Sequence, residues 1–131
     1  KAIMLLSFSD MHLARDEPKK AMEMATKALA SFHRIRDKRG QVLALHQTGE
    51  VQKLFNDAGK MLVAVREAIP LLVELEDDKL EASMMEIKSH AYQLTGDADA
   101  ALRATQDALV LSRKIGDKIG EGVALNNTAN A

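Results

Sequence analysis

Two pairs of histidine and glutamate carry the most versatile side-chain chemistry in this chain. His46 and Glu50 are four residues apart, and Glu86 and His90 have the same spacing in the reverse order further along the chain. Residues four apart lie one turn apart on the same helix face. Such a set fits three roles: a solvated polar patch, a patch that binds a basic or polar segment of a partner, or a divalent-metal site. In a partner-binding patch, the histidines make the affinity depend on pH near neutrality.

The remaining sequence offers no support for catalysis. It contains no nucleophile elbow, no phosphate-binding loop, no glycine-rich dinucleotide fingerprint and no cysteine. The adjacent carboxylates of Asp77 and Asp78 fall at a predicted helix junction, where capping and solvation explain them. The histidines and glutamates belong to no dedicated metal motif. We therefore expect no enzymatic activity, no cofactor and no metal.

A single repeat period organises the whole chain. One apolar position recurs as Leu29, Ile69 and Leu109. An acidic position recurs in equal steps as Asp37, Asp77 and Asp117. A fixed period of about 40 residues is the signature of stacked structural repeats. Such proteins usually act as binding surfaces, because their stacks create extended concave faces.

Within each repeat, apolar residues recur every three or four positions, which predicts amphipathic helices and not strands. Turn signals such as Asn56–Gly59 separate them, and the recurring aspartate is placed to cap the following helix. The predicted helices span residues 2–15, 18–36, 41–55, 58–76, 81–95, 98–115 and 119–131. Pro70 falls inside the fourth, as a tolerated kink on its outer face or a functional hinge.

Composition narrows the class of partner. The formal net charge is −1 and acidic and basic residues are mixed, which argues against nucleic acid as a partner. The basic segment 33–39 is interrupted by Asp37, and we interpret it as a solvated helix end in preference to a phosphate-binding patch. No apolar run approaches the length of a membrane span. We expect a cytoplasmic protein that binds neither nucleic acid nor membrane.

The segment Ile115–Asn127 resembles the junction between 40-residue tetratricopeptide repeats, as found in kinesin light chains and Pins-type spindle-orientation proteins. The small-residue positions of that family fall at Ser9, Gly49, Ser89, Ala28, Ala68 and Ala108. Met61 is larger than the family pattern prefers. The resemblance covers essentially the whole chain. It implies an all-α, right-handed α-solenoid of antiparallel helix pairs with about seven helices.

The resemblance also implies a division of the chain. Repeat 1 spans about residues 1–39, repeat 2 about 40–79 and repeat 3 about 80–119, with the first helix of a fourth repeat at 120–131. The chain starts with lysine and ends inside a helix, so we expect a fragment of a longer protein. Its uncovered terminal helices suggest end-to-end stacking as a homo-oligomer.

In this family the first helix of each repeat lines a concave groove. The resemblance therefore implies groove positions at Leu6, Asp10, Leu13, Leu43, His46, Glu50, Lys53, Glu86, His90, Gln93 and Asn126. Lys53 is the one cation among them, which disfavours a clamp for a C-terminal carboxylate. The expected function is a scaffold that binds a peptide or helical segment of a partner protein. The alternatives are a self-assembly unit that stacks end to end and a regulatory module of a larger protein.

Overall fold

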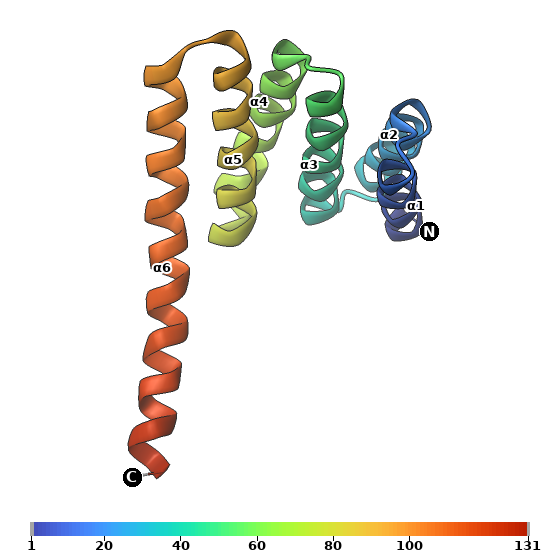
Figure 1. The fold of residues 1–131 in the computed structure, drawn as a ribbon. Coiled ribbons are helices and arrows are strands. Elements are labelled where there is room, and N and C mark those ends of the chain that lie inside the picture. The colour runs from blue at the N-terminus through green and yellow to red at the C-terminus, as the bar shows by residue number, and fades with distance from the viewer. Residues whose placement is uncertain (1, 131) are drawn as a thin grey trace.

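The structure, a computed structural model, describes the backbone of residues 2–130 and the side chains of residues 2–116. Every element in that range is an α-helix, and consecutive helices pack against each other along the chain (Figure 1). The helices are α1 (Ala2–Ala14), α2 (Pro18–Arg34), α3 (Lys38–Leu54), α4 (Ala58–Leu75), α5 (Asp78–Thr95) and α6 (Ala98–Asn130). The prediction of an all-α helical-repeat fold is confirmed.

Aspartates cap α3, α4 and α5. The sequence predicted the caps at Asp37 and Asp77, and Asp57 is a further one. The Oδ1 atoms of Asp37, Asp57 and Asp77 accept hydrogen bonds from backbone N–H groups three residues later, at 2.9, 3.0 and 3.1 Å. Because these bonds satisfy N–H groups that a helix leaves free, α3 and α5 begin at Lys38 and Asp78, three residues earlier than predicted.

The connections between helices also repeat, at half the sequence period. A residue with positive φ occurs in equal steps near successive helix ends, at Asp16, Arg36, Asn56, Glu76 and Gly96. A left-handed residue other than glycine costs roughly 1–2 kcal/mol. The tight antiparallel turns are therefore maintained by the packing of the helices they join. Inside α4, Pro70 lies on an exposed face and the helix continues to Leu75.

The prediction of a separate seventh helix at residues 119–131 is wrong. The α6 helix is continuous from Ala98 to Asn130, and its backbone passes the end of α5 (Figure 1). Gly116 is the next position in the series that ends at Gly96, yet it remains helical. A turn there would give up helical hydrogen bonds, and only packing of the helices around the turn compensates for that loss. Within the described chain, α5 is the one helix whose backbone lies close to the α6 backbone, so no further helix packs there to favour a turn.

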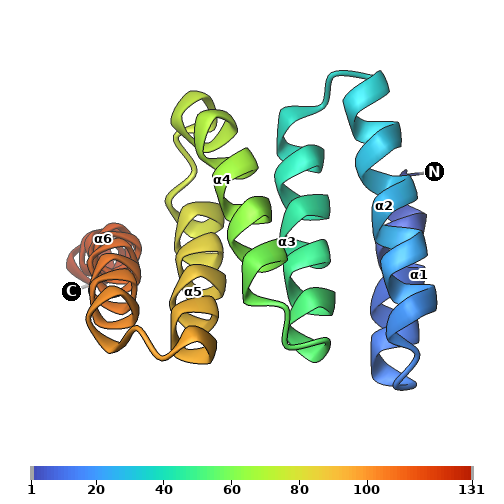
Figure 2. The same cartoon turned by 90° about the horizontal axis from the view of Figure 1, so that it is seen from above.

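The stack has two unlike sides. The first helices of successive repeats approach each other closely, α1 with α3 and α3 with α5, whereas within the described chain α2 and α4 do not approach each other in this way, nor do α4 and α6. Figure 2 shows α3 lying between α2 and α4. We therefore call the side on which the first helices approach each other the inner side. The second helices lie apart on the outer side.

Small side chains permit close packing of the two helices within a repeat. The Ser9 Oγ donates to the carbonyl of Ala21 at 2.8 Å, and two repeats later the Ser89 Oγ donates to that of Ala101 at 3.1 Å. The middle repeat instead combines Gly49 with Met61, which is fully buried. The large methionine at this position is therefore part of the core.

The same small residues receive a side chain from the next repeat. The Gln47 Nε2 donates to the Ser9 Oγ at 3.1 Å, and the amide is almost fully buried. At the next junction Ile87 takes the place of Gln47 and lies so close to Gly49 that a Cβ there would be 2.8 Å from its Cδ1. The repeat thus has a polar pair at one junction and a steric pair at the next.

A third close approach lies between α2 and α3. Phe32 is buried, and its ring occupies the space that a Cβ on Gly40 would need. One repeat later, the corresponding residues are Leu72 and Leu80, two medium-sized side chains of one core cluster. The first junction therefore pairs a large side chain with a glycine, whereas the second fills the same space with two leucines.

We predict that Gly40→Ala lowers the free energy of unfolding by about 2–3 kcal/mol, because overpacking against a buried ring forces helices apart. Phe32→Leu in the Gly40→Ala background is expected to cost at least about 1 kcal/mol less than in the wild type, in line with the coupling expected for contacting residues. Urea unfolding of the four proteins measures both values. Equal costs of Phe32→Leu in the two backgrounds would contradict this packing.

Candidate functional site

The first helices carry ten of the eleven predicted groove residues. The α1 helix carries Leu6, Asp10 and Leu13; α3 carries Leu43, His46, Glu50 and Lys53; α5 carries Glu86, His90 and Gln93. All ten are at least partly exposed, and their helices lie next to each other. The eleventh, Asn126, lies outside the residues whose side chains are described. Leu6 also packs against the core cluster that contains Phe32, so it contributes to stability as well as to the surface.

On α3, Glu50 is compensated by two neighbours on the same helix. Its Oε1 lies 3.7 Å from the His46 Nε2, and its Oε2 lies 3.7 Å from the Lys53 Nζ. Partly exposed pairs of this kind are worth less than about 1 kcal/mol. They order the three side chains along one face more than they stabilise the fold.

On α5, the other three predicted residues line one hollow. Glu86, His90 and Gln93 face it together with residues of α6, and its volume is about 200 Å³. The α6 side contributes Thr105, Ala108, Leu109 and Ser112, and Ser89 completes the lining. Among the described side chains, Glu86 has no ion-pair partner. This part of the face therefore has an uncompensated negative charge.

The two His–Glu sets remain on their own helices. Among the described side chains, no ion pair joins the α3 set to the α5 set. In the same part of the chain, no group of three or more histidine, aspartate or glutamate side chains has a geometry that would hold a metal.

Two basic residues of the segment 33–39 lie in the first turn of α3 and pair with acidic residues at the junction of α4 and α5. Lys38 forms an ion pair with Glu74, and Arg39 pairs with Asp77. Asp77 also accepts hydrogen bonds from the backbone of Leu80 and Lys79. The bond from Leu80, followed by that from Arg39, lowers the pKa of Asp77 below its ordinary value although partial burial opposes the shift.

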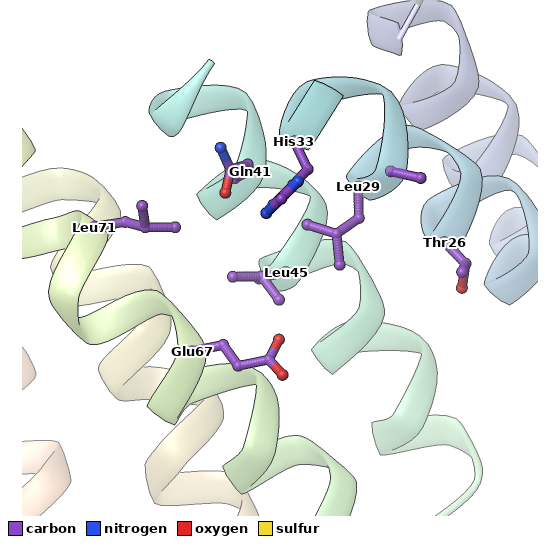
Figure 3. A pocket seen from close by; sticks show the side chains of 8 residues that line it. Thr26, Leu29, His33, Gln41, Leu45, Glu67 and Leu71 are labelled. Atoms are coloured by element: carbon purple, nitrogen blue, oxygen red, sulfur yellow. The ribbon is translucent and has the colours of Figure 1, made fainter. Parts of the chain in front are cut away.

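A second hollow, on the outer side, was not anticipated from the sequence. It lies between α2 and α4 with α3 at its base and has a volume of about 600 Å³ (Figure 3). Its lining includes His33 and Glu67, which lie on second helices. The sequence does contain one indication of this hollow, because residue type at these positions differs between repeats. His33 corresponds to Val73, and Thr26 corresponds to Arg66.

Comparison with known proteins identifies no relative of this chain. No protein-family model matches the chain, and no curated protein matches it by sequence. No helix in the described part of the chain combines the length and hydropathy needed to cross a membrane. The fold itself therefore defines the class, an all-α helical-repeat protein.

We predict that Asp77→Asn lowers the free energy of unfolding at pH 7 by up to about 1 kcal/mol, because the exposed ion pair is lost while asparagine still caps the helix. Since the folded-state pKa is lowered, the carboxylate stabilises the fold above its ordinary pKa of about 3.9. That contribution disappears as the pH falls through the lower folded-state value.

Thermal unfolding of wild type and Asp77→Asn between pH 7 and pH 2.5 measures this difference. Asp37→Asn is the matched control, because Asp37 caps α3 in the same way without an ion pair among the described side chains. A loss for Asp77→Asn that stays constant across this pH range would contradict the assignment.

Proposed function

We propose that the chain is a protein-interaction scaffold of the tetratricopeptide-repeat type. Its partner is an extended or helical segment of another protein, bound along the face of α1, α3 and α5. The support is that α1 contacts α3 and α3 contacts α5, so the exposed side chains on the inner side of these helices lie next to one another. A cytoplasmic location belongs to the same proposal.

The charge of this face specifies the partner further. This face carries three carboxylates, those of Asp10, Glu50 and Glu86. The one lysine among the predicted groove residues, Lys53, is already paired with Glu50. Exposed leucines such as Leu43 lie among them. Complementary charge steers encounter and selects partners, so the preferred segment combines basic and apolar residues.

One observation favours self-assembly as a second candidate. The α1 helix leaves Ile3 and Met4 69% and 59% exposed, with Phe8 and Met11 also exposed. At the positions equivalent to Met4 and Met11, the residues of α3 are Ala44 and Val51, which are fully buried. A second copy stacked against α1 would cover these methionines and give a mass that rises with concentration.

The groove proposal is tested with a displayed library of random 16-residue peptides. We expect the selected peptides to contain lysine or arginine beside leucine-like residues, and to lose at least about tenfold in affinity for Glu50→Lys/Glu86→Lys. The matched control is Glu23→Lys/Asp107→Lys, which makes the same change of charge on exposed positions of second helices.

Selected peptides that bind the groove variant and the control equally would overturn the proposal. A failure to enrich any peptide, combined with a concentration-dependent mass in sedimentation, would favour self-assembly instead. If Met4→Glu/Met11→Glu then restored a monomer, that candidate would replace the first.

A further inference from the structure

The outer hollow has the dimensions of a ligand site. Its volume of about 600 Å³ lies within the range of small-molecule pockets, about 300–1,000 Å³. Leu29 and Ala30 line it from α2, Leu71 lines it from α4, and the nearly buried Leu45 forms its base on α3 (Figure 3). Three helices thus contribute to the apolar base of an open hollow.

Four polar side chains surround this apolar base. They are Thr26, His33, Gln41 and Glu67, contributed by the same three helices (Figure 3). Within the described chain, none of these four side chains has a hydrogen-bond or ion-pair partner. An apolar pocket with a few convergent, unengaged polar groups is the usual composition of a small-molecule site.

The charge in this hollow is negative and uncompensated. Glu67 is the one carboxylate among the lining residues. Glu74, further along the same helix, is neutralised by Lys38, which lies one turn before Gln41 on α3. Lys38 is therefore already engaged, and Glu67 has no ion-pair partner among the described side chains.

The next repeat differs in the residue that would supply a cation. The position of Glu67 is taken there by Asp107, and the position of Thr26 is taken by Arg66. The first junction thus keeps the acid but has a small hydroxyl residue in place of the arginine. Because Glu67 is exposed, its carboxylate is open to a cation from solvent, and contact with the apolar base must supply the rest of the affinity.

From this arrangement we propose that the hollow between α2, α3 and α4 binds a small organic cation, a protonated amine attached to an apolar body. The ammonium group pairs with the Glu67 carboxylate, and the apolar body lies against Leu29, Leu45 and Leu71. The Gln41 amide and the His33 imidazole remain available to hydrogen-bond polar substituents. This site is separate from the first-helix face and does not depend on the function proposed for it.

The test compares three probes that share an indole ring: tryptamine, the neutral alcohol tryptophol and the anion indole-3-propionate. We expect NMR titration at pH 7.5 to shift the methyl signals of Leu29, Leu45 and Leu71 with tryptamine at low-millimolar or lower concentration. Tryptophol is expected to bind about fivefold to tenfold more weakly, and the anion more weakly still.

Two exposed substitutions isolate the charge. Glu67→Gln keeps the shape and is expected to weaken tryptamine about fivefold to tenfold without changing tryptophol. Thr26→Arg introduces an arginine where the next repeat has Arg66. It is expected to weaken the binding of tryptamine at least as much as Glu67→Gln does. Asp107→Asn is the matched control and is expected to leave tryptamine binding unchanged.

Three results would overturn the proposal. One is an absence of shifts at the three leucines with every probe up to about 10 mM. Binding that is undetectable at that concentration is too weak for a specific site. The second is equal affinity for the cation and the anion. The third is an equal loss of tryptamine binding in Glu67→Gln and Asp107→Asn.

Discussion

The close approach of the first helices is the constraint on which the rest of this structure depends. It requires a small residue at one position of each repeat, and Ser9 and Gly49 supply it. The next repeat then inserts Gln47 or Ile87 against that residue. Because the helices are drawn together on this side only, the second helices stand apart, and the stack acquires an inner and an outer face.

Both candidate binding surfaces follow from that asymmetry. On the inner side, neighbouring helices bring separate side chains such as Glu50 and Glu86 onto one surface that can follow a peptide. On the outer side, the distance between α2 and α4 leaves the hollow that contains Glu67. Both junctions bury apolar side chains, but with different residue pairs, and the polar residues on the two faces also differ between repeats. Any specificity of the two proposed sites therefore lies in the residues that depart from the period.

Much of the fold could be predicted from the sequence, because helix period, aspartate caps and the recurring repeat positions are read directly along the chain. The course of α6 could not, because the turn signal at Gly116 and Asp117 competes with helix continuation, and tertiary packing decides between them. The outer hollow was missed because it depends on the distance between α2 and α4, which no local pattern encodes. The proximity of His46 to Glu50 follows from their spacing on one helix, whereas the hollow that Glu86 and His90 share with α6 depends on how α5 and α6 pack.

One side-chain pair between repeats sets the approach of the first helices. A double-mutant cycle on Ser9→Gly and Gln47→Ile tests it most directly, because the double variant reproduces the Gly49–Ile87 pair at the first junction. We expect the double variant to lose at least about 1 kcal/mol less free energy of unfolding than the sum of the losses in the two single variants. Strictly additive losses in urea unfolding would contradict it.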